Sequence, residues 1–298
     1  MISVLEKGNK KGIEQLMRNI RVDNYGIKIM LPKAVTHLVR LGPISNIAAN
    51  ILKQEMLSLG ADAAIARDAL TGKAKKTDCL MMGNLSQFTR LQEKLKKQPF
   101  GLSEVALELS RTLDNYHKDK FSLKLGSHRL SLGSRSRIMA VVNLTPDSFS
   151  GDGLYPRFSS DYIVRHVENM VREGADIIDI GAESSRPGAI KVTLKEELSR
   201  AIPLIKLLTK KIKIPVSIDT YKPQVARLAL DNGAVMVNDI TGLADPKMLK
   251  VIAQYKAAAV IMHMRGRPEN MQLNPQYQDV VLEIIGFLGK AIERAVTA

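Results

Sequence analysis

The spacing of apolar and polar residues changes near residue 138. From there on, short apolar runs of strand length alternate with amphipathic segments of helical length. This alternation predicts a parallel β-sheet covered by helices. The predicted strands cover residues 138–144, 176–180, 214–218, 234–237 and 258–262. The predicted helices cover about 160–173, 195–211, 222–231, 246–255 and 278–296.

The first third of the chain predicts a smaller α/β unit. Ser45 is a candidate N-cap for a helix, and Gly60 is a suitable residue to end it. Residues 78–83 are a short apolar run that predicts a buried strand. Two more helices are expected, over about 85–97 and over about 103–116 with Ser103 as candidate cap.

A hairpin marks the boundary between the two parts. Residues 121–125 and 128–132 alternate in polarity on either side of Gly126 and Ser127, which predicts two antiparallel strands joined by a tight turn. We therefore expect a basic N-terminal α/β extension over residues 1–117, with no assigned role. A second domain over residues 118–298 would hold the hairpin and five βα units.

The composition is that of a folded, water-soluble chain. Of 298 residues, 45% are apolar and 25% are charged, which excludes a largely disordered or collagen-like protein. The single cysteine, Cys79, cannot form an intrachain disulfide, and no apolar run is long enough to span a membrane. The N-terminus becomes charged too early for a signal peptide, so a cytoplasmic protein without a membrane partner is expected.

The positive charge is concentrated at the N-terminal side. Residues 1–137 hold 24 Lys and Arg against 12 Asp and Glu, whereas residues 138–298 hold 20 against 18. Such an excess favours anionic ligands by long-range attraction. The basic residues lie in short clusters, however, and match no nucleic-acid-binding motif. Nucleic acid is therefore not an expected partner.

A polar residue stands at the end of each predicted strand. These residues are Asn143, Asp179, Asp219, Asn238 with Asp239, and His263. Any one of them could be a turn or cap residue. Because parallel α/β folds place their ligand sites at the carboxyl ends of the strands, five in series favour a shared site.

The number of βα units leaves two architectures open. A (βα)8 barrel needs about 250 residues, but only 161 remain from residue 138 to the end, enough for five units. The segment is then either an open doubly wound sheet or a barrel without its last three units.

Two loop motifs carry a family resemblance. Residues 143–150 read Asn-Leu-Thr-Pro-Asp-Ser-Phe-Ser, and residues 179–189 read Asp-Ile-Gly-Ala-Glu-Ser-Ser-Arg-Pro-Gly-Ala. Shorter motifs end the third, fourth and fifth strands at 217–223, 237–240 and 262–266. In this order and spacing, residues 121–298 resemble the dihydropteroate synthases, a pterin-binding TIM-barrel family. The resemblance implies a TIM (β/α)8-type barrel, incomplete, with about five βα units.

The resemblance also implies a reaction and its substrates. The enzymes join p-aminobenzoate to 6-hydroxymethyl-7,8-dihydropterin pyrophosphate and release pyrophosphate, in folate biosynthesis. The implied pterin-binding residues are Asp179, Ser185, Asp219 and Asn238. The implied contacts for p-aminobenzoate and its loops are Asp147, Ser148, Phe149, Ser185 and Pro187. A buried carboxylate can accept hydrogen bonds from the ring N–H and amino group of a pterin, and an amide can both donate and accept.

Catalysis is expected to depend on charge and positioning. By resemblance, Asn143, Arg186 and Asp219 are the catalytic residues, and Asn143 is the protein ligand of Mg²⁺ near the pyrophosphate. An amide oxygen is a suitable hard ligand for this ion. The aniline nitrogen is already neutral at pH 7, so no strong base is required. A homodimer is also expected.

The sequence departs from the family pattern in several places. Ala182 and Ser185 stand where the family usually has Gly and Thr, and Asp152 is displaced by one position in the first loop. The family's later Asp-Pro-Gly, Ser-Arg-Lys and Arg-Val-His motifs do not occur after Met271. We therefore expect a truncated family member, whose activity is open. The alternatives are a non-catalytic pterin-binding or interaction protein and a flavodoxin-like sheet with a nucleotide ligand.

Overall fold

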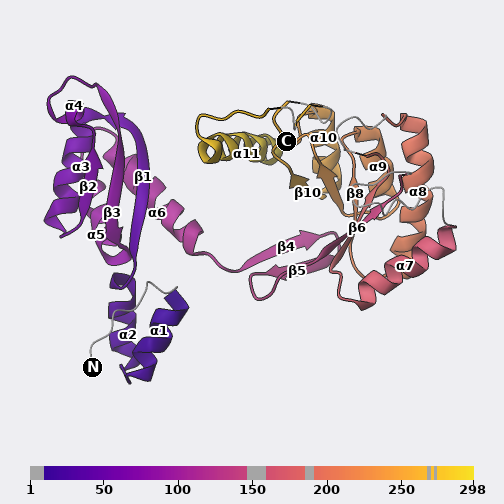
Figure 1. Ribbon diagram of the computed structural model, residues 1–298, viewed down its shortest axis with the longest axis horizontal. Helices are drawn as coiled ribbons and strands as arrows, with labels where there is room; N and C mark the ends of the chain where they lie inside the picture. Colours follow the sequence, from indigo (N-terminus) through magenta and orange to yellow (C-terminus); the bar gives the residue numbers. More distant parts are fainter. Residues whose placement is uncertain (1–9, 146–158, 185–190, 267–269, 272–273) are drawn as a thin grey trace. The chain divides into compact units, whose positions relative to one another are not determined.

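The chain forms two compact units. The computed structural model describes residues 10–145, 159–184, 191–266, 270–271 and 274–298. Unit 1 is Met1–Lys118 and unit 2 is Asp119–Ala298. Each has its own strands and helices (Figure 1). Within the described residues, no helix combines the length and the apolar character needed to cross a membrane.

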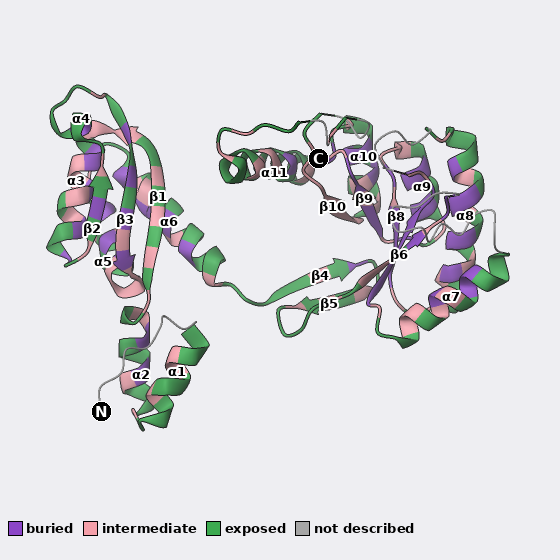
Figure 2. Ribbon diagram, in the orientation of Figure 1, coloured by how far each residue is buried: buried purple, intermediate pink, exposed green. Residues whose placement is uncertain are grey.

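Unit 1 is a three-stranded antiparallel sheet with helices. Its strands, in the spatial order β1-β3-β2, are β1 (Thr36–Ser45), β3 (Lys76–Asn84) and β2 (Asp62–Ile65). Its helices are α1 (Lys10–Asn19), α2 (Asn24–Met30), the 3-10 helix η1 (Leu31–Lys33), α3 (Asn46–Ser58), α4 (Arg67–Leu70), α5 (Leu85–Leu95) and α6 (Leu102–His117). Buried side chains of α3, α5 and α6 form one core with the sheet (Figure 2).

The central strand β3 is half-buried. Cys79 and Met81 are buried, whereas Asp78 and Leu80 between them are exposed. The expectation of a buried strand at 78–83 is therefore wrong in its burial, although a strand lies there. The physical reason is that the unit-1 core includes only alternate residues of β3, as in an antiparallel sheet with one packed face.

Two of the three expected helix signals in unit 1 are confirmed. The Ser45 hydroxyl accepts a hydrogen bond from the Ala48 amide at 3.2 Å and caps α3. Gly60 follows the end of α3 with φ +69°, the left-handed conformation that favours glycine. Ser103 is not a cap: α6 begins at Leu102, after Gly101 with φ +77°. The left-handed Gly101 caps the helix two residues before Ser103, which leaves Ser103 inside the first turn.

Unit 2 is built around a five-stranded parallel sheet. Its strands, in the spatial order β10-β9-β8-β7-β6, are β10 (Ala258–Ile261), β9 (Met236–Asp239), β8 (Val216–Asp219), β7 (Ile177–Gly181) and β6 (Met139–Asn143). Its helices are α7 (Ser160–Arg172), α8 (Leu194–Lys211), α9 (Pro223–Asp231), α10 (Pro246–Tyr255) and α11 (Val280–Thr297). A two-stranded hairpin, β4 (Phe121–Leu125) with β5 (His128–Leu132), precedes the sheet.

The strand order decides between the two architectures that the sequence left open. Within the five-stranded sheet, each strand pairs with the next strand along the chain, without a reversal of order. A flavodoxin-like sheet has the order 2-1-3-4-5, with a switch point after its first strand. The flavodoxin-like alternative is therefore wrong, and the chain has an α/β fold with a sequentially ordered parallel sheet.

The two faces of this sheet have different chemistry. One face carries apolar residues such as Ile178, Ile180 and Ile218, which pack with buried residues of α7 to α10 (Figure 1). The opposite face, called the polar face below, carries polar residues toward the carboxyl ends of the strands. These residues are Asn143, Asp179, Ser217, Asp219 and Asn238. Because side chains alternate along a strand, one register keeps all five on that face.

The hairpin covers the amino-terminal end of the polar face. Leu125 of β4 is fully buried and packs with Ile177 of β7 and Met236 of β9. Asp176, directly before β7, accepts hydrogen bonds from Arg135 at 2.6 Å, from Arg137 at 2.8 Å and from the Ile138 amide at 3.0 Å. The hydrogen bond from Arg135 is the largest cause that holds the pKa of Asp176 well below its usual range. The segment between the hairpin and β6 is therefore tied to the start of β7.

The buried phenylalanine of unit 1 gives a first prediction. Phe88 is completely buried, so Phe88→Ala should reduce the free energy of unfolding of unit 1 by about 3–5 kcal/mol. Phe100→Ala is the matched control, because Phe100 is 58% exposed. The measurement is urea denaturation of both variants, followed by circular dichroism. Equal stabilities for the two variants would contradict the position of Phe88 in the core.

Candidate functional site

The parallel register brings four strand ends into one row. Asn143 pairs with Gly181, Gly181 with Asp219, and Asp219 with Asn238. Residues paired in a sheet point to the same face, so these four line the polar face. Asp179 lies two residues before Gly181 and faces the same way. The structure therefore brings together Asn143, Asp179, Asp219 and Asn238, all predicted from the sequence.

Asp179 is the most buried member of this group. Its side chain is 2% exposed, and its Oδ2 accepts a hydrogen bond from Asn238 Nδ2 at 2.9 Å. Burial raises the pKa of Asp179. Side-chain hydrogen bonding from Ser217 and Asn238 lowers this pKa and so partly offsets the effect of burial. Its other oxygen and the Ser217 hydroxyl are buried without a hydrogen bond of normal geometry among the described residues. A ligand donor could supply the partner that this Asp179 oxygen lacks at normal hydrogen-bond geometry.

Ser217 was not predicted as a site residue. It pairs with Asp179 in the register of β7 and β8 and is fully buried. The available signal was the two-residue period of a strand, because Ser217 stands two positions before Asp219 and must share its face.

Asp219 carries the largest resolved change in acidity at the site. Burial, together with the negative charges of Asp179, Glu197, Asp239 and Glu183, raises the pKa of Asp219 to about 8. The side chain is half-buried, at the open end of the polar face. A carboxyl group in such surroundings favours a neutral form until a ligand donates hydrogen bonds to it.

Gly181 lies between Asn143 and Asp219 in the register of the sheet. A Cβ atom at this position would lie 3.5 Å from Asn143 Oδ1 and 3.7 Å from Asp219 Oδ2. Both are ordinary van der Waals distances, so the backbone does not require glycine there. An alanine methyl group would contact both the amide oxygen and the carboxylate oxygen.

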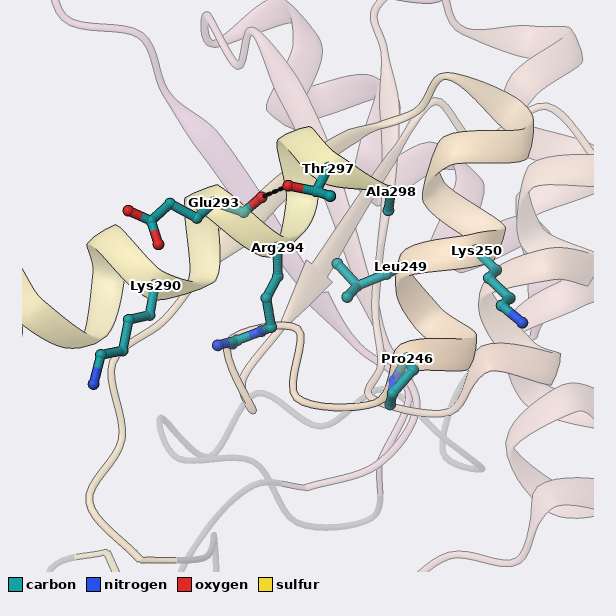
Figure 3. A pocket seen from close by; sticks show the side chains of 8 residues that line it. All are labelled: Pro246, Leu249, Lys250, Lys290, Glu293, Arg294, Thr297 and Ala298. Atoms are coloured by element: carbon teal, nitrogen blue, oxygen red, sulfur yellow. Dashed lines mark hydrogen bonds between the residues drawn. The ribbon is translucent and has the colours of Figure 1, made fainter.

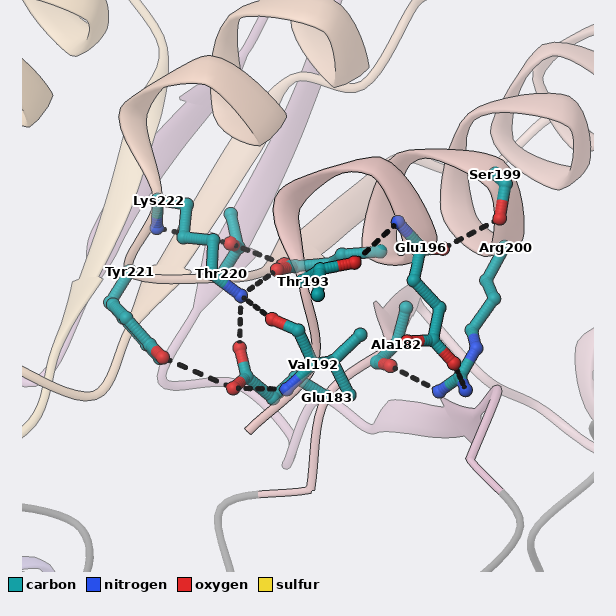
Figure 4. Close-up of polar contacts among 11 residues, drawn as sticks. Ala182, Glu183, Val192, Thr193, Glu196, Ser199, Arg200, Thr220, Tyr221 and Lys222 are labelled. Carbon is teal, nitrogen blue, oxygen red and sulfur yellow. Dashed lines mark hydrogen bonds and ion pairs between the residues drawn. The ribbon is translucent and has the colours of Figure 1, made fainter. Parts of the chain in front are cut away.

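A second polar cluster lies beside this row, called the Lys222 cluster below. It consists of Glu183, Val192, Glu197, Thr220, Tyr221 and Lys222, and all of these except Glu197 are labelled in Figure 4. The Lys222 ammonium donates to both glutamates and to the Val192 carbonyl, the last at 2.9 Å. None of its members was predicted from the sequence as a site residue. Its signal was Glu197, a charged residue four positions before Ala201 on the buried side of α8.

Two strand-end residues do not join the row. Asp239 lies one residue beyond Asn238 and therefore points to the opposite face, where its Oδ1 accepts hydrogen bonds from the amide and hydroxyl of Thr241 at 2.8 and 2.7 Å. The His263 ring packs against Phe287, with ring centroids 5.0 Å apart.

Six predicted loop residues lie outside the described residues. They are Asp147, Ser148, Phe149, Ser185, Arg186 and Pro187.

The groups that could hold a metal are few. In the part of the chain that the structure describes, no three His, Cys, Asp or Glu side chains gather as a metal site. Oxygen atoms of Asn143 and Asp219 lie on either side of Gly181 in the register of the sheet. A cavity of about 650 Å³ lies elsewhere in unit 2, between α10 and α11, and its lining includes Lys250, Lys290 and Arg294 but none of the predicted site residues (Figure 3).

The chain is similar to proteins of known family. The family model described as pterin binding enzyme matches residues 139–298. A dihydropteroate synthase of Synechocystis sp. is 44% identical over 174 residues, which are 58% of this chain and 60% of that protein. The crystal structure of the Burkholderia cenocepacia dihydropteroate synthase complexed with 7,8-dihydropteroate has a TM-score of 0.51 at 38% identity, covering 59% of this chain and 58% of that chain.

One relative also matches part of unit 1. A probable bifunctional folylpolyglutamate synthase/dihydropteroate synthase of Halobacterium salinarum is 38% identical over 245 residues, or 82% of this chain and 29% of that protein. Because unit 2 begins at Asp119, a match of this length extends into unit 1. The chain spans less than two thirds of the length of either relative. Since the family model covers more than half of its residues, the chain belongs to the family of pterin binding enzymes.

Proposed function

We propose that this protein acts as a dihydropteroate synthase, which condenses p-aminobenzoate with 6-hydroxymethyl-7,8-dihydropterin pyrophosphate. The observation that carries the proposal is the row of Asn143, Asp219 and Asn238 beside Asp179 on one face of the sheet. Relatives with 38–44% identity over the same part of the chain are named dihydropteroate synthases.

The polar face suits the pyrimidine edge of a pterin. That edge presents an amino group and ring N–H groups as donors, beside acceptor atoms. Asp219 would accept from the donors, and the buried oxygen of Asp179 without a partner would accept a further hydrogen bond. Asn238, held by Asp179 at 2.9 Å, would present a fixed amide to the same ring. Because unpaired buried polar groups are costly, such a site discriminates against rings without those donors.

The proposed reaction exchanges one bond for another. The amino nitrogen of p-aminobenzoate forms a bond to the pterin methylene carbon, and the bond from that carbon to the pyrophosphate oxygen breaks. The amine loses one proton and pyrophosphate leaves with the bonding electrons. Holding the ring in place is then the main contribution of the polar face, since the neutral aniline needs no strong base.

We also propose that Mg²⁺ serves as cofactor and that Asn143 holds it. The donor chemistry fits, because Mg²⁺ prefers oxygen ligands and is often held by one or two protein oxygens, with phosphate and water completing its shell. When bound, the ion would neutralise negative charge on the pyrophosphate. Arg186 would add positive charge there, and Asp147, Ser148, Phe149, Ser185 and Pro187 would contact p-aminobenzoate or order its loops. Ser185 would also contact the pterin.

The proposal includes an architecture and a cellular setting. The five strands would form part of a TIM (β/α)8-type barrel with the polar face inside. Their sequential order, and the packing of α7 to α10 on the opposite face, support this arrangement. A homodimer and a cytoplasmic location complete the proposal and rest on the family resemblance.

A second candidate function is pterin binding without turnover. The observation that favours it is that the side chains gathered on the polar face, Asp179, Asp219 and Asn238, are those proposed to contact the pterin. Isothermal titration with dihydropterin pyrophosphate, combined with an assay of pyrophosphate release in the presence of Mg²⁺ and p-aminobenzoate, separates the two functions. Release supports the synthase, and binding without release supports the second candidate.

The carboxylate at the end of β8 gives the most direct mutational prediction. Asp219→Asn keeps the shape of the side chain but replaces one acceptor oxygen with a donor, so pterin affinity should fall by at least about tenfold. Asp161→Asn, an exposed position on α7 with the same change in charge, should leave the affinity unchanged. Titration calorimetry with 6-hydroxymethylpterin measures both. Equal affinity in the Asp219 variant and the wild type would disprove this assignment.

The acidity of Asp219 predicts a pH dependence of binding. Its pKa near 8 means that the carboxyl group is mostly neutral at pH 7, whereas the proposed contact needs the carboxylate. Pterin affinity should therefore rise from pH 6 to pH 8, by up to about tenfold per pH unit below the pKa. Above pH 8 it should level off. Without added Mg²⁺, Asp219→Asn should show no such rise, and a flat wild-type profile would exclude this linkage.

The same raised pKa has the opposite effect on folding. When the pKa of an aspartate is raised in the folded state, unfolding releases its proton at any pH between the unfolded and the folded pKa. The free energy of unfolding therefore falls as the pH rises through this range. Asp219→Asn should therefore have a higher Tm than the wild type at pH 8, with a difference that shrinks toward pH 5. Thermal unfolding without ligand tests this, and a variant less stable than the wild type at pH 8 contradicts it.

The position of Gly181 between Asn143 and Asp219 gives a steric prediction. Gly181→Ala adds a methyl group at ordinary contact distances from Asn143 and Asp219, so Tm should change little. The methyl group fills space that the ligand would occupy, and pterin binding should weaken by about tenfold or more. Gly286→Ala is the control, because an added Cβ there meets nothing within 4 Å. Unchanged binding by Gly181→Ala would place the ligand elsewhere.

A further inference from the structure

The three residues that follow Asp219 all belong to the Lys222 cluster. The Thr220 hydroxyl donates to Glu197 at 2.6 Å, and the Tyr221 hydroxyl donates to Glu183 at 3.1 Å. Lys222 donates to both glutamates (Figure 4). The chain segment that leaves β8 is therefore held side chain by side chain.

The donors of the Lys222 ammonium group and the acceptors around it are equal in number. The Lys222 ammonium has three N–H donors, and its three acceptors are Glu183, Glu197 and the Val192 carbonyl. The side chains of Lys222, Glu183 and Glu197 are only 18%, 11% and 1% exposed. Glu197 is thus a fully buried carboxylate whose described ion pair is with Lys222. Removing the cation would leave it uncompensated, which is costly in a protein interior.

The cluster is connected to the backbone that carries Asp219. The Thr220 amide donates to the Asn238 carbonyl at 2.9 Å, across to β9. The Thr220 hydroxyl oxygen accepts from the Lys222 amide at 3.1 Å while it donates to Glu197. The position of Asp219 is therefore fixed by Asn238 on one side and by the Lys222 cluster on the other.

The same cluster holds the residues that follow β7. Glu183 comes two residues after Gly181 and accepts from the Val192 amide at 3.1 Å as well as from Lys222. Arg200 of α8 donates to the Ala182 carbonyl at 3.1 Å. Through Glu183 after β7 and Thr220 after β8, the ends of these two strands thus share the Lys222 cluster as a support.

We propose that Lys222 is a positioning residue, whose ammonium fixes the ends of β7 and β8 so that Asp219 and Asp179 meet the pyrimidine edge of a pterin together. This inference rests on the proposed function. Lys222 is assigned no contact with the ligand, because its three donors are all used within the cluster. It acts by holding the backbone on both sides of Gly181 in place before a ligand arrives.

Substitutions at Lys222 test this role. Lys222→Met keeps most of the side-chain length and removes the charge and all three donors, so pterin affinity should fall by about tenfold or more. Lys222→Arg keeps the charge and enough donors for both carboxylates, and should restore the affinity to within about threefold of the wild type. Lys250→Met, at an exposed lysine of α10, is the matched control and should bind like the wild type. All are measured by calorimetry with 6-hydroxymethylpterin.

Amide exchange of the free protein tests the inference without a ligand. In Lys222→Met the Thr220 amide should exchange with solvent faster than in the wild type, and in Lys250→Met it should not. This measurement still tests how Lys222 holds the strand ends if the wild type binds no pterin. Absence of pterin binding by the wild type would reject the proposed function. If Lys222→Met does not fold, Glu183→Gln replaces it, because the variant removes one charged acceptor and leaves Glu197 paired.

The outcomes are distinct. Weaker binding in Lys222→Met, recovery in Lys222→Arg and faster exchange at Thr220 support the positioning role. Wild-type affinity in a folded Lys222→Met variant overturns it. Equal losses in the Met and Arg variants, or unchanged exchange at Thr220, also overturn it.

Discussion

The hydrogen-bonded register of the parallel sheet is the constraint on which the proposed site depends. It places Asn143, Gly181, Asp219 and Asn238 side by side, although they are spread over almost a hundred positions of the chain. A slip of one residue in any strand would turn its polar group toward the helices and an apolar group into the site. The apolar face, packed with α7 to α10, opposes such a slip. Packing on one side of the sheet therefore protects chemistry on the other.

The second feature on which the proposed site depends is an excess of acidic groups on the polar face, where burial limits their contact with water. Asp179 and Asp219 share the polar face, and the nearest described cation of the cluster, Lys222, is bound by Glu183 and Glu197 instead. Such a surface is unfavourable without a ligand, because buried carboxyl groups resist ionisation. It is complementary to a ring with several N–H donors. Stability and recognition thus make opposite demands on Asp219, as expected at a functional site.

The sequence predicted the elements of unit 2 well because each carries a local signal. The apolar runs and the helical periods mark the strands and helices without knowledge of their neighbours, and the polar strand ends mark Asp179, Asp219 and Asn238. Ser103 was wrong as a cap because the left-handed Gly101 starts α6 earlier. The Lys222 cluster was missed because its two ion pairs, from Lys222 to Glu197 and to Glu183, join residues 25 and 39 positions apart. Such contacts follow from the register, which the sequence pattern alone does not specify.

The β4–β5 hairpin has a consequence for how a flat ligand reaches this surface. Leu125 is completely buried against Ile177 and Met236, so the amino-terminal end of the polar face is sealed by aliphatic side chains. In the proposed function, a bicyclic ring would then enter from the carboxyl ends of the strands, with its leading edge toward Asp179. Its substituent would point back toward the carboxyl ends. The hairpin would thus set the direction of insertion and leave the reactive substituent where a second substrate could meet it.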